Sequence, residues 1–303
     1  MEASVPEQLV DPAVLAQLAL PAVFAGIVAV LSTVAVERLG GARGGIVSSI
    51  PTTIVPAAIG IWGAGEDIDG FRRAMAFVPI GILLNAGYLV LWRVIPAFVG
   101  RHTRTHLLAW TLTLSLGAWL CIAAGIMWMN DLVRPTVAQS LVMGSIAFAT
   151  GIALGIAANL RPHPAPKGTH RVGTHVLLVR GLAAAIVIAI AIFLNRAGLP
   201  VASGIASVFP VIFTTIMVAT WLAQGAHVPT GAVGPMALGT LSVSTYALLA
   251  TMLFPVLPVA LAATLCWIAS VACVSVPAYL FLRARRNAAI QPRVVESVGE
   301  RSA

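Results

Sequence analysis

The sequence predicts an all-α protein that crosses a membrane several times, and three observations lead to this class. Hydrophobic residues make up 59% of the 303 residues, whereas charged residues make up only 9%. A soluble domain carries about 25% charged residues, so a water-soluble globule is excluded. The apolar residues also gather into runs of the roughly 20 residues that a helix needs to cross a bilayer.

Nine apolar runs are long enough to form such helices. The predicted spans cover residues 13–36, 45–64, 74–98, 106–128, 136–158, 176–195, 200–224, 231–254 and 258–282. The second and the seventh contain proline, serine and threonine near their middle, so each of these two could instead be a re-entrant hairpin. The sequence therefore predicts about nine transmembrane helices, with proline-broken second and seventh helices.

The charges between the spans favour nine crossings and predict their orientation. With nine crossings, one side of the membrane receives ten basic residues: Arg38, Arg43, Arg101, Arg104, Arg161, Lys167, Arg171, Arg283, Arg285 and Arg286. The other side receives most of the acidic residues: Glu2, Glu7, Asp11, Glu66, Asp67, Asp69 and Asp131, with Arg72, Arg73, Arg134 and Arg196. Because cytoplasmic loops collect Arg and Lys, we expect a multi-pass protein of the cell (inner) membrane with its N-terminus outside and its C-terminus in the cytoplasm.

The sequence also contains an internal repeat with an offset of about 159 residues. The segment 45–51 (GIVSSIP) matches 204–210 (GIASVFP), and several residues in the following spans match in the same order. The matching residues are Gly81 with Gly239, Tyr88 with Tyr246, and Pro96 with Pro255. Span two then corresponds to span seven, five crossings later, and an odd number of crossings inverts the second copy. Inverted repeats with interrupted helices are a recurrent plan of secondary transporters, although channels also arise by duplication.

The repeat divides the chain into five predicted parts. These are an extracytoplasmic N-terminal segment (1–12), a first repeat of spans 1–4 (13–130), a linking fifth span with a basic cytoplasmic loop (131–172), a second repeat of spans 6–9 (173–283) and a cytoplasmic tail (284–303).

Pro51 and Pro210 occupy matching places in the repeat and predict two interrupted helices. Proline inside a helix removes a backbone hydrogen bond, whereas it suits the first turn of a new helix. A half-helix that starts there, with Ser49 as N-cap, would direct N–H groups and a positive helix dipole into the membrane. Such termini suit a carboxylate or another small anion. The alternative is a simple kink, in which Ser and Thr side chains bond to the freed carbonyls.

Polar side chains within the spans complete the predicted substrate-binding site, because such residues are costly in a membrane and often functional. The predicted site comprises Ser48, Ser49, Pro51, Thr52, Asn85, Ser207, Pro210, Thr214 and Ser242. Hydrogen bonding between helices is the alternative use of these polar side chains. No Asp, Glu, Lys or His lies deep inside a span, and Glu37 is the nearest, so coupling to an ion gradient would have to use it.

These features favour a transporter that moves a small anionic or zwitterionic solute by alternating access between inverted repeats. An ion or small-solute channel is the alternative, because the same residues could line a pore. A membrane-embedded lipid-modifying enzyme is less favoured, since the chain lacks the paired Asp-rich motifs of prenyltransferases. We therefore expect no enzymatic activity, catalytic residue, cofactor or metal. The expected partners are membrane lipid and a small-molecule solute, with a homo-oligomer as an option and no nucleic acid.

Overall fold

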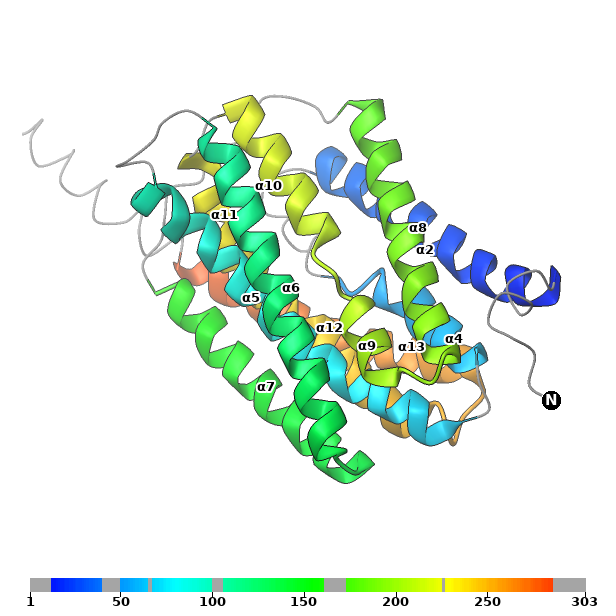
Figure 1. Ribbon diagram of the computed structural model, residues 1–303. Coiled ribbons are helices and arrows are strands. Elements are labelled where there is room, and N and C mark those ends of the chain that lie inside the picture. The colour runs from blue at the N-terminus through cyan, green and yellow to red at the C-terminus, as the bar shows by residue number, and fades with distance from the viewer. Residues whose placement is uncertain are drawn as a thin grey trace, which may run out of the picture.

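The computed structural model describes residues 12–39, 50–64, 67–99, 106–160, 173–224 and 227–285. Within these ranges the chain forms helices and no strands, in agreement with the all-α prediction (Figure 1). The helices are α2 (Pro12–Leu39), α4 (Ile54–Gly63), α5 (Ile68–Val99), α6 (Leu107–Val133), α7 (Val137–Ala158), α8 (Thr174–Arg196), α9 (Pro200–Ala206), α10 (Val211–Gln224), α11 (His227–Gly239), α12 (Leu241–Leu253) and α13 (Val259–Ser270). A π-helical turn, η1 (Val271–Ser275), continues α13.

Seven helical segments of the described chain are long and apolar enough to cross a membrane. They are Ile68–Val99, Leu107–Val133, Val137–Ala158, Thr174–Arg196, Pro200–Ala219, Gly231–Leu253 and Val259–Arg285. These segments correspond to the third to ninth predicted spans. Their length and composition make the chain a polytopic helical membrane protein.

The first two predicted spans contain shorter apolar helical stretches, Leu18–Leu31 and Ile54–Gly63. The second span differs from its predicted extent of 45–64, because α4 begins only at Ile54. Proline disfavours helical backbone at the residue before it, which here is Ile50. The amide of Thr52 donates to the carbonyl of Ile50 at 2.8 Å, so a turn precedes the helix. Residues 45–49 lie outside the described ranges.

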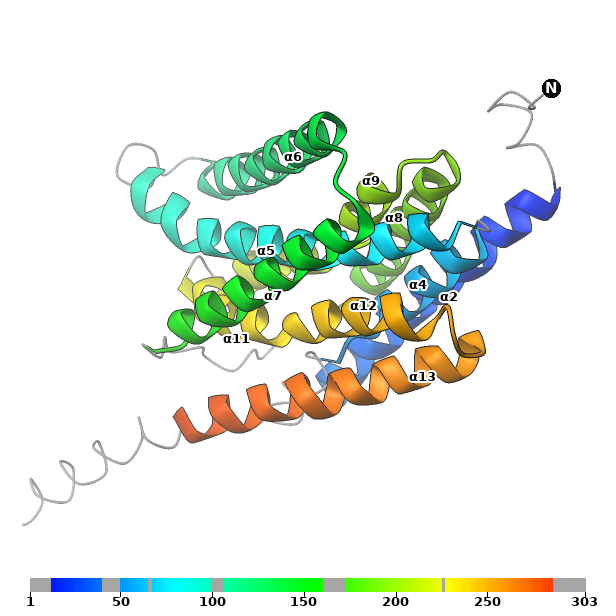
Figure 2. The ribbon, with the colours of Figure 1, turned by 90° about the horizontal axis from the view of Figure 1, so that it is seen from below.

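Helix α5 is the central element of the bundle. It packs against α6, α7, α9 and α12, and Figure 2 shows it running between α6 on one side and α12 on the other. Of the most apolar part of α5, 67% is buried inside the protein, compared with 22% for α6 and for α7. Helices α6 and α7 therefore present most of their apolar side chains outward, where a bilayer would cover them.

Glycines allow two helices to approach α5 closely. A Cβ atom at Gly204 of α9 would overlap the carbonyl oxygen of Ala74, and a Cβ atom at Gly144 of α7 would overlap that of Ala76. Small residues permit such backbone contacts between membrane helices. The glycine of the repeated segment in α9 is thus required by packing against α5.

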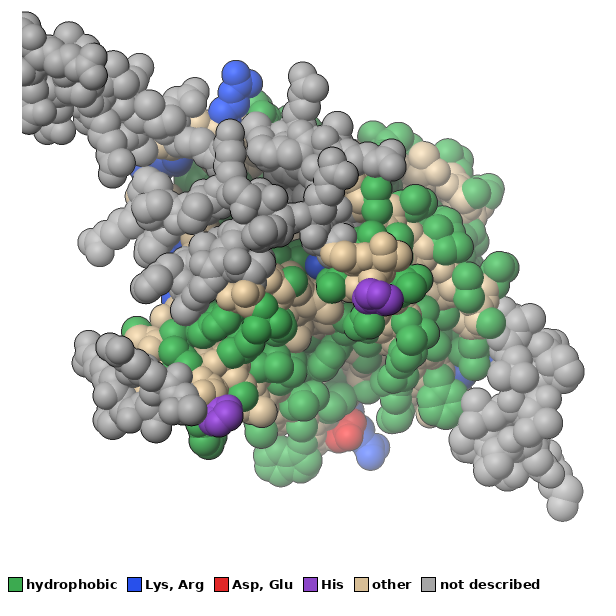
Figure 3. All heavy atoms as spheres, turned by 90° about the horizontal axis from the view of Figure 1, so that it is seen from above, with side chains coloured by type: hydrophobic (Ala, Val, Ile, Leu, Met, Phe, Trp, Pro, Cys, Tyr) green, Lys and Arg blue, Asp and Glu red, His purple; other side chains and the backbone are tan. Residues whose placement is uncertain are grey.

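Two further helix pairs hold the bundle together. Helix α2 packs along α8, where Gly26 faces the backbone of Gly181, and α4 packs against α2 and α8. Helix α12 packs against α5 and α13. Figure 3 shows apolar side chains over much of the described part of the face that it presents. Apolar surface of this extent is unusual on a soluble monomer and is typical of a protein embedded in lipid.

Candidate functional site

The chain is interrupted between α9 and α10, as Pro210 predicted for the seventh span. Helix α9 ends at Ala206 and α10 begins at Val211. The amide of Phe209 donates to Ala206 O at 3.0 Å, and the amide of Val211 donates to Phe209 O at 2.7 Å, so the connection is a tight turn. Pro210 precedes the first helical residue of α10, whereas the sequence analysis expected proline at the first helical position itself.

Asn85, in the middle of α5, forms a hydrogen bond to the turn at this interruption. Its Nδ2 donates to the carbonyl of Val208 at 2.7 Å, and its Oδ1 accepts from Trp119 Nε1 at 2.9 Å. The side chain is only 1% exposed. Asn85 therefore satisfies a carbonyl that the broken helix leaves free and ties α5 and α6 to the α9–α10 turn. This is the helix–helix bonding that the sequence analysis named as the alternative.

Tyr88 makes the second link from α5 to the same turn. Its hydroxyl lies 2.8 Å from Thr214 Oγ1, which itself donates to the carbonyl of Pro210 at 2.7 Å. Since the Thr214 hydrogen is used in that bond, the Tyr88 hydroxyl donates to the Thr214 oxygen. Thr214 was predicted as a site residue, whereas Tyr88 was noted only as part of the repeat.

Arg180 is a buried cation that was not among the predicted site residues. It lies inside the predicted span 176–195, is 4% exposed, and its Nε donates to Thr215 Oγ1 at 3.1 Å. Thr215 is the fifth residue of α10, so the guanidinium lies near the positive end of that helix. An arginine is always charged and costly in a membrane, and its position inside an apolar run was the available signal.

Arg93 is a second arginine within a predicted span. Its Nη1 donates to the carbonyl of Ala158 at 3.5 Å, and it is partly buried. Ala158 is the last residue of α7, so the guanidinium meets the negative end of that helix. Arg93 therefore stabilises a helix C-terminus, in contrast to Arg180.

The second predicted interruption precedes α4. Pro51 is buried, and Thr53 occupies the N-cap position of α4 without making a side-chain capping bond. The first N–H groups of a helix have no partner within that helix, so the start of α4 presents donors to its surroundings. Thr52, another predicted site residue, is half-buried beside it. Ser48, Ser49 and the Glu37 side chain lie outside the residues whose side chains are described.

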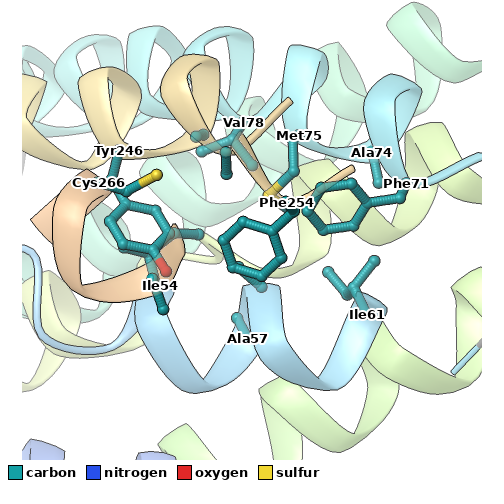
Figure 4. Close-up of a cluster of buried hydrophobic side chains, with 14 of the residues drawn as sticks. Ile54, Ala57, Ile61, Phe71, Ala74, Met75, Val78, Tyr246, Phe254 and Cys266 are labelled. Atoms are coloured by element: carbon teal, nitrogen blue, oxygen red, sulfur yellow. The ribbon is translucent and has the colours of Figure 1, made fainter. Parts of the chain in front are cut away.

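Tyr246, on α12, lies beside the start of α4. The residue is fully buried, and its hydroxyl has no hydrogen-bond partner among the described residues. Figure 4 shows the hydroxyl oxygen pointing toward Ile54, the first residue of α4, with Cys266 beside the ring. The surrounding cluster is apolar and includes Ala57, Met75, Val78 and Phe254.

Both interruptions border this apolar cluster. Val208, in the α9–α10 turn, packs against the same buried cluster that contains Ile54 and Tyr246. The structure thus brings Asn85, Pro210 and Thr214 together around one interruption, while Ile54 at the other lies in the cluster that Val208 packs against.

Ser207 and Ser242 are buried but serve the backbone of their own segments. Ser207 Oγ donates to Gly204 O at 2.7 Å, and Ser242 Oγ donates to Gly239 O at 3.0 Å. Both bonds fit the alternative, structural use of these side chains. Within the described residues, no group of three or more His, Cys, Asp or Glu could hold a metal ion.

The fold and the interrupted helices define a class, that of polytopic helical membrane proteins with buried polar side chains in their interior. The sequence matches no protein-family model, and neither curated proteins nor solved structures show significant similarity to it.

Proposed function

We propose that the protein is an integral membrane transporter that moves a small anionic or zwitterionic solute by alternating access. One observation carries the proposal: an interrupted apolar helix, α9–α10, has a buried arginine beside the first turns of its second half. Interrupted helices whose N-terminal ends point at anionic groups are typical of substrate sites in secondary transporters.

Charge supports the choice of an anion. Arg180 adds a permanent positive charge to the helix dipole of α10, and the predicted spans contain no acidic residue deep inside them. A cation would meet an unfavourable field there, whereas a carboxylate would meet donors and a counter-charge.

The packing of the helices supports the proposed inverted repeat. Under the repeat, α2 corresponds to α8 and α5 to the pair α11–α12, and each helix packs against its counterpart. The contact of α2 with α4 likewise has a counterpart in that of α8 with α10, and the contact of α5 with α6 has one in that of α12 with α13. A pseudo-two-fold axis in the membrane plane would produce this pattern, and nine crossings with an outside N-terminus complete the proposal.

A labelling experiment tests the proposed topology. In a variant without Cys121 and Cys273, single cysteines replace the exposed residues Asp67 or Asp69 or a residue within 161–171. An impermeant thiol reagent applied to intact cells should label the first two positions and not the third. Equal labelling on both sides would contradict nine crossings and the inverted repeat.

A flux assay tests the function itself. Purified protein in liposomes is offered labelled small carboxylates, zwitterionic amino acids and size-matched amines, and we expect saturable uptake of an anion or zwitterion. Arg180→Gln should reduce that uptake at least tenfold, Arg180→Lys should retain part of it, and Arg285→Gln, at an exposed position, should leave it unchanged. Preferential uptake of amines, or full activity in Arg180→Gln, would contradict the proposal.

The same liposomes separate a carrier from a channel. A carrier exchanges solute across the membrane faster when unlabelled solute is present on the other side, whereas a channel carries an ionic current without saturating at low concentration. Trans-stimulated exchange is therefore the expected result.

A further inference from the structure

Two tyrosines at matching positions of the repeat meet the starts of two interrupted helices. The Tyr88 hydroxyl contacts Thr214 in the first turn of α10, and the Tyr246 hydroxyl points toward Ile54 at the start of α4 (Figure 4). The residue that matches Thr214 in the first repeat is Val55, which has no hydroxyl. The pair of tyrosines is therefore equivalent in sequence but not in bonding.

The Tyr246 hydroxyl, which has no hydrogen-bond partner among the described residues, has an energetic cost. A buried hydroxyl without a hydrogen bond loses the bonds that it made to water, which costs about 1–3 kcal/mol. Phenylalanine at this position would fill the same apolar cluster without that cost. The presence of this costly hydroxyl is explained if it binds a ligand in another conformation of the protein.

The groups around the hydroxyl define what such a ligand must offer. The first turn of α4 presents N–H donors because Thr53 does not cap it, and its dipole is positive at that end. The Tyr246 hydroxyl adds a further donor. Around these donors the cluster is apolar, with Ala57 and Phe254 as neighbours. A carboxylate attached to a small apolar body fits both the donors and the apolar surroundings.

We propose that the start of α4 and the Tyr246 hydroxyl form a carboxylate-binding subsite of the transporter. This inference rests on the proposed function for its role, but its chemistry is tested separately by binding. The hydroxyl is enclosed in this conformation, so the carboxylate reaches it when α4 and α12 separate. At the matching place beside α10, the Tyr88 hydroxyl and the Thr214 hydroxyl already donate to partners within the protein.

Cys266 provides a local probe of this subsite, because it is fully buried in the same cluster and lies beside Tyr246. In a variant in which Cys121 and Cys273 are serine, a small membrane-permeant thiol reagent reports the opening of the cluster. We expect butyrate or hexanoate to slow the labelling of Cys266 at least fivefold and to raise the thermal unfolding midpoint. Butanol and butylamine, of similar size, should do neither.

Three variants test the role of the hydroxyl. Tyr246→Phe should raise the butyrate concentration needed for half of the protection at least tenfold. Val55→Thr should raise it as well, because the new threonine hydroxyl would give the Tyr246 hydroxyl a partner. Tyr279 lies in the helical residues 276–285 that follow η1 and is not part of this cluster. Tyr279→Phe is therefore the matched control, and butyrate should protect it as it protects the wild type. Equal protection in Tyr246→Phe, or no protection of the wild type by acetate, butyrate and hexanoate alike, would overturn the inference.

The outcomes distinguish the subsite from the transport proposal. Protection that depends on Tyr246 without any flux in liposomes would support the subsite and contradict the transporter. Flux of a carboxylate that is unchanged in Tyr246→Phe would support the transporter and overturn the subsite.

Discussion

The interruption at Pro210 and the interruption at Pro51 arise from the same sequence pattern but are completed differently. At the first, Asn85 bonds to the carbonyl of Val208, and Tyr88 bonds to Thr214. At the second, helix α4 starts without a side-chain cap from its N-cap residue, and the nearby tyrosine hydroxyl has no partner among the described residues. The matching prolines mark where the helices are interrupted. Side chains of the neighbouring helix determine whether the polar groups at each interruption have hydrogen-bond partners.

The difference follows from single substitutions between the two halves. Asn85 matches Val243 in the second repeat, and Thr214 matches Val55 in the first. In both places a hydrogen-bonding residue at the α9–α10 interruption is replaced by valine around α4. The Tyr88 hydroxyl is thus bonded within the protein, whereas the Tyr246 hydroxyl has no partner among the described residues.

The largest effect is expected at Asn85. Replacing Asn85 by leucine leaves the Val208 carbonyl and Trp119 Nε1 buried without their partners, which should destabilise the protein by about 2–5 kcal/mol. Val243→Ala at the matching position removes only apolar contacts and should cost about 1 kcal/mol. Equilibrium unfolding in detergent measures both, and equal losses would show that the two interruptions are not stabilised differently.

A smaller loss is expected from Gly204→Ala. Its Cβ would overlap the Ala74 carbonyl, so α9 must move away from α5 at a cost of about 1–3 kcal/mol. Gly117→Ala in α6 is the control, because a Cβ there has no neighbour within 4 Å and alanine favours a helix. The unfolding midpoint should fall for the first variant and hold or rise for the second.

The two tyrosines should respond in opposite directions. Tyr88→Phe removes a hydrogen bond to Thr214 and should destabilise the protein by about 0.5–1.5 kcal/mol. Tyr246→Phe removes a hydroxyl that has no partner among the described residues and should leave stability unchanged or raise it slightly. A double-mutant cycle of Tyr88→Phe with Thr214→Val isolates the bond, and a loss of stability in Tyr246→Phe would reveal an unseen partner there.

The smallest change in stability is expected from the prolines themselves. Pro51→Ala and Pro210→Ala restore a backbone N–H but remove two buried ring carbons. These effects oppose each other, so stability should change by about 1 kcal/mol or less. If the interruptions serve transport, uptake in liposomes should nevertheless fall in both variants. Wild-type uptake in both would indicate that the interruptions are structural kinks.

Part of the candidate site was predictable from the sequence. Asn85, Pro210 and Thr214 were predicted from their polarity or their place in an apolar run, and the structure gathers them around one turn. Ser207 and Ser242 were selected on the same ground but bond to their own backbone, because a serine hydroxyl can reach a carbonyl one turn back.

Other site residues could not be ranked by the sequence. Trp119 is one of seven tryptophans, and nothing local shows that its Nε1 meets Asn85. Tyr88 and Tyr246 form a matching pair in the repeat, yet only packing reveals that their hydroxyls differ. Arg180 is visible as an arginine in an apolar run, but its contact with Thr215 joins residues on two helices.

The sequence by itself determined the class of the protein, because apolar runs of sufficient length avoid water only in a bilayer. It also indicated interruptions at Pro51 and Pro210, since proline disfavours a continuous helix. Pro79 and Pro96 nevertheless lie inside α5, so proline alone does not determine where a helix is interrupted. The tertiary structure decided which freed backbone groups are bonded by distant side chains, such as the Val208 carbonyl by Asn85, 123 positions away in the sequence. The packing of the helices sets the distance between such residues, and this packing depends on several separate segments of the chain.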